Sequence, residues 1–390
     1  MAEPDLTDID LFSAWPYRDV WEPLRVATPI YWNAEQGGSG HWALTRHADI
    51  VSVLSDSETF TSELGIRLES GPAAVAAVRG RTLLVSDAPR HTLIKRAFAP
   101  MFSGRALAGM QVGVQRVADR VITAAVEVGT CDFAADVAAV VPSVVIGEIF
   151  ESRADTAQEL ARLTSEALGA EDPGEQSRAH SELFLYSGEL LDECLAGGPS
   201  PMAAALTAAV DLIGFEDVVL NIQGILLAAN ETTRYATAGA LGVLIDHCQV
   251  IPQVLTGWDM DSTVEEILRW TCPGMHLVRT ATRDVTVGGV PVSAGDRLVL
   301  WLASANFDED VFPEAAEFRA DRTPNPHLTF GSARHRCLGE RLARMELAAV
   351  LRALRRSVHS AEYTGSPTPR RSNHLRGLDH MPVRLTPRHD

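Results

Sequence analysis

A single cysteine stands in a loop whose other residues suit a bound cofactor. In "HLTFGSARHRCLGERLARMELAAVL", residues 327–351, Cys337 comes just before a strongly helical run. A thiolate is a metal ligand, and a helix N-terminus favours negative charge. Gly331 and Gly339 let the backbone approach a flat cofactor closely. An iron–sulfur cluster requires several cysteines, so one thiolate here predicts an axial haem ligand, with a buried free cysteine as the alternative.

A carboxylate and a hydroxyl interrupt the longest apolar run of the chain. "AANETTR" places Glu231 and Thr232 in the middle of residues 215–247. A carboxylate in apolar surroundings is costly unless it is paired or functional, so the two side chains mark a candidate functional position. The alternative is a kinked helix in which the threonine hydroxyl bonds back to a carbonyl.

A second acid–base pair lies upstream of the cysteine, in "EEILRW". Glu266 and Arg269 are three residues apart, so on a helix they share one face and can form a charge-assisted hydrogen bond. The spacing alone favours an ordinary surface ion pair, and a buried structural pair is the alternative.

Helices must position these groups. Apolar periodicity predicts them over roughly 104–128, 155–169, 176–196, 215–247, 263–271 and 339–357. The run 215–247 is apolar nearly all round, so a helix of roughly 50 Å is expected to cross the protein interior. Strand signals are few: "YWNAEQGGSGHWALT" and "DVTVGGVPV" indicate hairpins, and "DRLVLWLAS" indicates one further strand.

Composition narrows the class of protein. The formal net charge of −17 disfavours nucleic acid and anionic membranes as partners. No apolar run is long enough to span a bilayer, and the acidic N-terminus lacks the features of a signal peptide, so a cytoplasmic protein is expected. The five cysteines include no CxxC pair, which removes the signature of zinc ribbons and thioredoxin chemistry. They are Cys131, Cys194, Cys248, Cys272 and Cys337.

The loop around Cys337 is similar to the haem-binding signature of the cytochrome P-450 family, usually written FGxGxHxCxG. It reads FGSARHRCLG here, with Ala333 in place of one family glycine. Glu266 and Arg269 match the family's ExxR pair, and "NFDEDVFPEAAEFRADR" resembles the segment that leads to the loop. Because the order and spacing of these motifs match along essentially the whole chain, it is identified as a member of this family.

The resemblance implies a fold of mainly α class, with small β-sheets, in a single domain over residues 1–390. In that fold the helices form a triangular prism, and haem b lies between the long central helix and the helix after the cysteine loop. Cys337 would ligate the iron, and Phe330, Gly331 and Gly339 would shape the loop against the haem.

The resemblance also assigns roles on the long helix, where the family pattern is AGxDT or AGxET. Thr232 would help deliver protons to bound dioxygen, and Glu231 would lie on the proton route. Ala228 and Ala229 would lie beside the haem, and Ala229 replaces the family glycine, so a tighter oxygen groove is expected.

Positive partners for the haem carboxylates come from three further motifs. "DAPRHTLIKRAF" resembles the family's DPPxHxxxR helix, so His91 matches and Lys95 replaces the usual arginine. Arg279 and His335 match the other two partners. Lysine keeps the charge but loses the bidentate geometry of arginine. Each of these residues could instead be a solvated surface charge.

Substrate contacts can be placed only by region. The family's recognition segments fall near 62–84, 165–180, 222–232, 273–278 and 374–378. Their apolar members suit a hydrophobic substrate, although each could be an ordinary core residue; they are Leu226, Ala228, Met275, Leu277 and Val278.

The function expected from the resemblance is a monooxygenase that inserts one atom of O2 into a hydrophobic small molecule, by hydroxylation or epoxidation. Electrons would come from NAD(P)H through a ferredoxin reductase and a ferredoxin. A basic patch at Arg96, Arg334, Arg336, Arg341 and Arg344 would dock the acidic donor. "NETTR" and "RTPNPHLTFG" resemble members from natural-product pathways, which suggests a terpenoid, polyketide or carrier-tethered substrate.

Two other functions stay open on the sequence. One is a haem-thiolate enzyme that uses peroxide or works without O2; such enzymes often lack the acid–alcohol pair that this chain retains at Glu231 and Thr232. The other is a haem-binding sensor or carrier without turnover, against which the full set of proton-delivery and haem-carboxylate motifs weighs.

Overall fold

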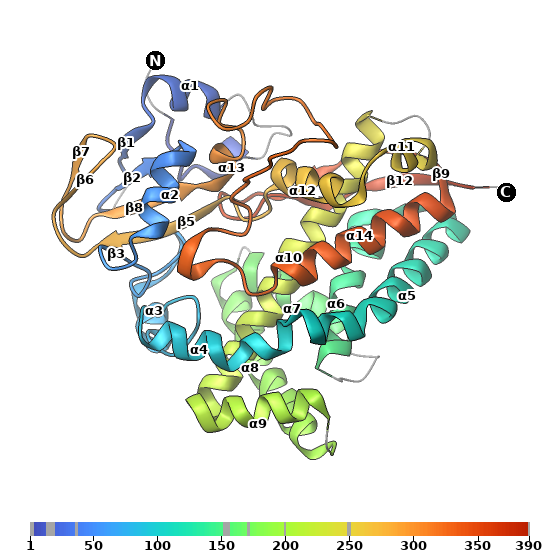
Figure 1. Ribbon diagram of the computed structural model, residues 1–390, viewed down its shortest axis with the longest axis horizontal. Coiled ribbons are helices and arrows are strands. Elements are labelled where there is room, and N and C mark those ends of the chain that lie inside the picture. The colour runs from blue at the N-terminus through green and yellow to red at the C-terminus, as the bar shows by residue number, and fades with distance from the viewer. Residues whose placement is uncertain are drawn as a thin grey trace. The chain divides into compact units, whose positions relative to one another are not determined.

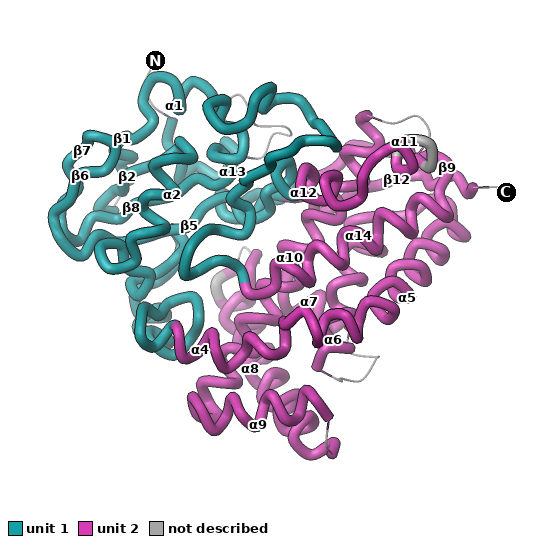
Figure 2. The backbone as a smooth tube through the Cα atoms, in the orientation of Figure 1, with its two compact units in different colours: residues 1–91, 268–337, 369–376 teal, residues 92–267, 338–368, 377–390 magenta. Residues whose placement is uncertain are grey.

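The computed structural model describes residues 4–12, 20–35, 38–150, 157–169, 172–198, 200–247 and 251–388 (Figure 1). The chain forms two compact units, each assembled from three separate stretches (Figure 2). Unit 1 comprises Met1–His91, Leu268–Cys337 and Pro369–Arg376. Unit 2 comprises Thr92–Ile267, Leu338–Thr368 and Gly377–Asp390. The single domain expected from the sequence stays a prediction.

Unit 1 is built around a five-stranded sheet in the order β1-β2-β8-β5-β3. Strands β2 and β8 are parallel, and the other neighbours are antiparallel. The predicted N-terminal hairpin and the predicted strand in "DRLVLWLAS" are therefore confirmed. The strands are β1 (Ile30–Asn33), β2 (His41–Leu44), β3 (Phe60–Thr61), β5 (His276–Ala281) and β8 (Arg297–Trp301).

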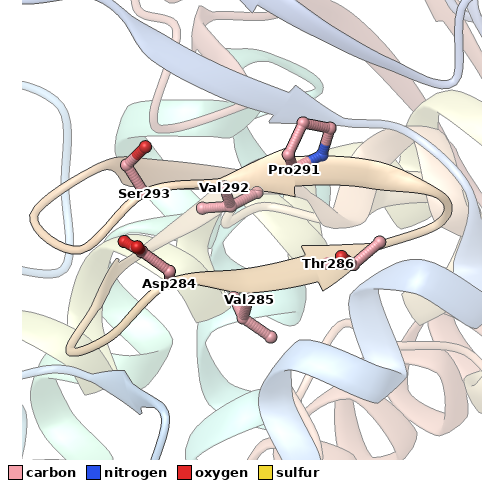
Figure 3. Close-up of a pocket in the computed structure, with 6 residues that line it drawn as sticks. All are labelled: Asp284, Val285, Thr286, Pro291, Val292 and Ser293. Carbon is pink, nitrogen blue, oxygen red and sulfur yellow. The ribbon is translucent and has the colours of Figure 1, made fainter.

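The second predicted hairpin forms β6 (Val285–Val287) and β7 (Val290–Val292). Gly288 and Gly289 between them have φ of +54° and +85°, the left-handed values that a tight two-residue hairpin turn requires. An open pocket lies on this hairpin, lined by Asp284, Val285, Thr286, Pro291, Val292 and Ser293 (Figure 3). None of these lining residues is a predicted site residue.

Aromatic side chains form much of the core of unit 1. Trp301 at the end of β8 is fully buried; the ring of Phe12 stacks on it at 5.6 Å, and the tilted ring of Trp21 lies 5.1 Å from it. The short helices of this unit are η1 (Ile9–Phe12), α1 (Trp21–Ala27), α2 (His47–Ser55), α3 (Pro72–Val78), α13 (Leu302–Ala305) and η6 (Ala333–His335). Two helices continue along the chain from one unit into the other, α4 (Arg90–Phe98) and α12 (Met260–Thr271).

Unit 2 is mainly helical and is organised around α10 (Phe215–His247), which has the bounds predicted from the sequence. It packs against α6 (Val140–Ile149), α7 (Ala157–Gly169), α8 (Pro173–Ala196), α9 (Pro201–Ile213) and α14 (Glu340–Ser357). Helix α5 (Gly104–Val128) runs beside α14 (Figure 1). The last turns of α10 bury Ala236, Gly239, Ala240 and Gly242, whose small size allows neighbouring elements to approach closely.

A three-stranded antiparallel sheet, β4-β12-β9, completes unit 2. Its strands are β4 (Thr130–Asp132), β9 (Val358–Tyr363) and β12 (Pro382–Pro387). The remaining elements are η3 (Ala99–Phe102), η4 (Ala134–Ala138), α11 (Ile251–Gly257), β10 (Thr368–Pro369) and β11 (Leu378–His380). Within the described residues, no helix combines the length and the apolarity that a membrane span needs.

Candidate active site

The loop that carries Cys337 turns back on itself through backbone hydrogen bonds. The Gly331 N–H donates to the Leu328 carbonyl at 2.7 Å, and the Cys337 N–H donates to the Phe330 carbonyl at 2.9 Å. Gly331 is buried with φ +66°, and a Cβ added there would lie 3.8 Å from Leu277 Cδ1. A side chain would fit in this space, so the left-handed backbone is what favours glycine at position 331.

The thiol of Cys337 is exposed, three residues before α14 begins. The alternative of a buried free cysteine is therefore wrong for this residue. Cys272 shows what that alternative looks like: it is fully buried, and burial raises the pKa of its thiol to about 12. Cys248 lies outside the described residues.

Ala333 occupies the position of a family glycine with a left-handed backbone, φ +53°. A left-handed L-residue costs roughly 1–2 kcal/mol, which glycine avoids. We expect Ala333→Gly to raise the free energy of unfolding by about 1 kcal/mol, because it relieves this strain at an exposed position. Chemical denaturation checks this, with Ala316→Gly as the matched change in the neighbouring loop. Equal or lower stability of Ala333→Gly would show that the loop relaxes around alanine.

Arg269 anchors the segment that leads to the cysteine loop. Its guanidinium is fully buried and donates to the carbonyls of Asn306 at 2.8 Å, Ala315 at 3.0 Å and Glu317 at 3.2 Å. The ring of Phe307 lies under it at 4.9 Å. Glu266 is also fully buried, so the surface ion pair that the spacing favoured is wrong for this motif.

Asn306 is a positioning residue that the sequence did not reveal. Its side-chain carbonyl accepts from the Leu328 N–H at 2.7 Å, and its amide donates to Arg269 O at 3.2 Å and Thr329 Oγ1 at 2.9 Å. The Thr329 hydroxyl in turn donates to the Leu268 carbonyl at 2.8 Å. This buried network ties the end of α12 to the start of the cysteine loop. The only available signal was an asparagine in the motif "NFDEDVF".

Three of the four predicted cationic partners come together in unit 1. The rings of His91 and His335 lie 4.1 Å apart between centroids, and His335 Nε2 is 3.2 Å from Ser62 Oγ. Ser62 also donates to Asp87 at 2.9 Å. The buried guanidinium of Arg279 is close enough to the Asp87 carboxylate for the charge of Asp87 to raise its pKa. Lys95 lies half-buried on α4, in unit 2.

Arg279 tests whether these residues suit a haem carboxylate. Only 3% of it is exposed, and its guanidinium donates to the Val278 carbonyl at 2.8 Å. In the part of the chain that the structure describes, no carboxylate forms an ion pair with it. Burial lowers its pKa to about 10, and the charge of Asp87 opposes this only in part. A buried guanidinium of this kind fits an anionic group such as a haem propionate.

The acid–alcohol pair lies on α10, and a cation accompanies it. Glu231 is 2% exposed, and its Oε1 lies 3.7 Å from Nη1 of Arg234. Arg234 also donates to Ser165 Oγ on α7 and to the Asp379 carbonyl on β11, each at 3.3 Å. The i,i+3 spacing of glutamate and arginine in "ETTR" was the signal that the sequence offered for this pair.

Thr232 makes the hydrogen bond that its structural alternative describes. Its hydroxyl donates to the Ala228 carbonyl one turn earlier, at 2.7 Å, while α10 continues as one helix. Ala228 is exposed and Ala229 is half-buried. The back-bond holds the hydroxyl at one place along the helix, and its role in proton delivery stays a prediction.

The predicted substrate contacts differ in accessibility. Leu226 is 1% exposed on α10, and Met275 and Val278 lie in the hydrophobic core of unit 1. Leu277 keeps part of its surface accessible, as does Ala228. The exposed surface of Leu277 and Ala228 favours these two residues as substrate contacts. Core packing equally explains the positions of the other three residues.

Comparisons with known proteins identify the family. The sequence model described as "Cytochrome P450" matches residues 260–361. Cytochrome P450 NovI of Streptomyces niveus is 35% identical over 395 residues, which cover 99% of this chain and 97% of that protein. Linalool 8-monooxygenase of Pseudomonas putida is 30% identical over 419 residues, which cover 100% of both.

A solved structure agrees. The crystal structure of P450 OxyD, described as involved in the biosynthesis of vancomycin-type antibiotics, matches with a TM-score of 0.90 at 31% identity, over 98% of this chain and 100% of that one. The chain belongs to the cytochrome P450 family and has its mainly helical fold with small sheets. It is a P450 monooxygenase, an oxidoreductase, which confirms the prediction made from the motifs.

Proposed function

We propose that this monooxygenase binds haem b through Cys337 and holds the haem carboxylates with Arg279, His91, His335 and Lys95. The observation that carries this is the exposed thiol in a tightly turned loop just before α14, in a unit that also buries Arg279 with no ion pair among the described residues. When bound, a thiolate-ligated haem supplies the activation of O2.

The role of this chain's own residues is to place protons and to exclude water. Glu231 is buried with its Oε1 3.7 Å from Nη1 of Arg234, and Arg234 is itself fixed by α7 and β11. Thr232 follows on the same helix, with its hydroxyl oxygen available as an acceptor while its proton is donated to Ala228. We propose that this pair orients the water that supplies protons. Its presence favours the O2-using enzyme over a peroxide-using one or a sensor.

Replacing Thr232 tests the proton role. We expect Thr232→Ala to retain haem binding and lower the product formed per NAD(P)H consumed by about tenfold or more, because the hydroxyl no longer orients water. The lost reducing equivalents should appear as hydrogen peroxide. Thr233→Ala, the same change one residue along α10, is the matched control. If Thr232→Ala couples as well as the parent, the hydroxyl is structural, as its hydrogen bond to Ala228 would also explain.

We propose a hydrophobic natural-product intermediate as the substrate: a terpenoid, a polyketide or a carrier-tethered molecule. Support comes from the names of relatives, which include a linalool monooxygenase and a P450 involved in biosynthesis of vancomycin-type antibiotics. The accessible apolar residues Leu277 and Ala228 are consistent with this. A substrate-library binding screen on the haem-loaded protein distinguishes the three classes.

We propose that electrons arrive from NAD(P)H through a ferredoxin reductase and a ferredoxin, in the cytoplasm, where that reductant is available. Arg334 and Arg336 are exposed beside the thiol and suit an acidic donor. Arg344, expected from the sequence to join this patch, instead binds Glu265 at 3.0 Å and Glu340 at 2.9 Å, so its charge is already compensated.

The docking proposal predicts a salt dependence. Ferredoxin-driven reduction should slow as ionic strength rises, because the Debye length is about 8 Å at physiological strength. Arg336→Glu should slow it further, whereas Arg162→Glu, far along the chain on α7, should not. Reduction that is insensitive to salt would place the donor on another face.

A further inference from the structure

Unit 1 contains polar side chains that the proposed function leaves unused. His276 is fully buried, and its Nε2 accepts from the Leu68 N–H at 3.3 Å. Its other nitrogen, Nδ1, therefore carries the proton and donates to the Asn373 carbonyl at 3.0 Å. Both ring nitrogens are hydrogen-bonded to backbone groups. His276 is therefore a neutral imidazole that links its own strand, β5, to the chain at Leu68 and at Asn373.

His374 lies against this imidazole and has donor capacity to spare. Its ring centroid is 4.9 Å from that of His276, and its carbonyl accepts from the Met275 N–H at 2.8 Å. The ring is half-buried and makes no hydrogen bond to any residue that the structure describes. Burial, with His276 and Arg67 nearby, lowers its pKa well below the usual range, so the ring is neutral with one N–H to donate.

Arg67 is the charged member of the group. It is half-buried and close enough to both imidazoles to lower their pKa values. Within the described ranges its guanidinium makes no hydrogen bond and no ion pair, and burial lowers its own pKa, which the exposed Glu69 only partly opposes. Its five N–H donors therefore remain available to an acceptor that the described residues do not supply.

The group lies where a substrate is expected. Arg67, His276 and His374 come from three of the predicted recognition segments, 62–84, 273–278 and 374–378. Backbone hydrogen bonds join these segments within unit 1, and the Val278 N–H donating to the Ile66 carbonyl at 2.9 Å is one of them. A cationic substrate group would be repelled here, and a purely apolar one would leave the donors unsatisfied.

We propose that Arg67 and His374 form an oxyanion subsite that binds an acidic group of the substrate. The planar guanidinium matches a carboxylate or a phosphate, and the neutral imidazole adds one N–H. The acidic group is the carboxylate of a free acid or the phosphodiester of a pantetheine arm that tethers the substrate to a carrier. This inference rests on the proposed function and names the substrate chemistry of that site.

Stability gives a first test that needs no substrate. In the haem-loaded enzyme, Arg67→Gln should leave the melting temperature unchanged, because Arg67 is half-exposed and its guanidinium makes no hydrogen bond or ion pair within the described ranges. Arg25→Gln is the matched control: Arg25 is 4% exposed and bonds Glu309 and Ser304, so its loss should lower the melting temperature. A clear loss of stability in Arg67→Gln would show a structural arginine and overturn the proposal.

Binding gives the second test. Calorimetric titrations of the haem-loaded enzyme would compare decanoate with decanamide, phenylacetate with phenylacetamide, and phosphopantetheine with pantetheine. We expect the anion of at least one pair to bind about 10- to 100-fold more tightly than its neutral analogue, the worth of a charge-assisted hydrogen bond. Arg67→Gln should remove that difference and keep the neutral affinity. Arg79→Gln, an exposed arginine paired with Glu63, should keep the difference.

Each outcome bears on the proposal. A preference for the carboxylates indicates a free acid, and a preference for phosphopantetheine indicates a tethered substrate. No preference in any pair, or a preference that survives Arg67→Gln, overturns the subsite. The carbon monoxide spectrum of the same preparations reports haem-thiolate ligation separately, so the subsite can fail while the proposed function stands.

Discussion

Replacing Cys337 with serine is expected to abolish the red-shifted Soret band of the ferrous carbon monoxide complex. That band reports a thiolate on the iron, and a serine hydroxyl has almost the same size but does not supply a soft, charged sulfur. Because Cys337 is exposed and its loop is held by backbone hydrogen bonds, the substitution should leave the fold intact. Difference spectroscopy and circular dichroism on the same sample check both expectations.

The other cysteines supply the control for this result. Cys131 is half-buried on β4, and burial raises the pKa of its thiol to about 11, so it is protonated at neutral pH. Cys131→Ser should keep the band at full strength. A Cys337→Ser protein that retains the band would mean that another residue ligates the iron and that the loop assignment is wrong.

The largest effect on stability is expected from Arg269→Ala. The change removes a fully buried guanidinium that donates to three carbonyls, and it leaves the fully buried Glu266 without the charge three residues away on the same helix. Removing one partner of such a buried arrangement costs roughly 3–5 kcal/mol. Because the lost guanidinium also holds the carbonyl of Asn306, whose side chain accepts from the Leu328 N–H, the cysteine loop should loosen as well.

Unfolding in urea and the haem-to-protein ratio after purification measure both consequences. Glu266→Ala should behave similarly, with poor expression or loss of haem. Arg319→Ala removes an exposed arginine of the same segment, paired with Glu314, and should leave both measurements unchanged. An Arg269→Ala protein of parental stability with full haem content would show that the network is dispensable.

Periodicity predicted most of the long helices because their apolar stripes are strong. Helices α5 and α10 have the predicted bounds, and α8, α12 and α14 differ from prediction by a few residues at their starts. Helix α6 was missed because its residues are apolar on all sides, which leaves no stripe to detect. Helix α9 was missed for a related reason, since its run of alanines has little contrast between faces.

The site could be predicted only as far as its motifs reach. Motif positions indicated Cys337, Arg279 and Thr232, but no pattern reveals that Asn306 reaches Leu328 or that Arg234 reaches Ser165, since those are tertiary contacts between distant segments. The left-handed backbone of Ala333 had one signal, the family glycine at that position, although alanine itself rarely adopts it.

The interleaving of the two units has a consequence for how the chain folds. In unit 1 the parallel pairing of β2 with β8 sets Trp42 opposite Leu298, and in unit 2 β4 pairs with β12, setting Thr130 opposite Arg384. Contacts of such high contact order form slowly, and a ribosome delivers β8 and β12 long after their partners. The sheet of unit 2 therefore cannot close until β12 has been made, so the helices between β4 and β12 are synthesised before that sheet can form.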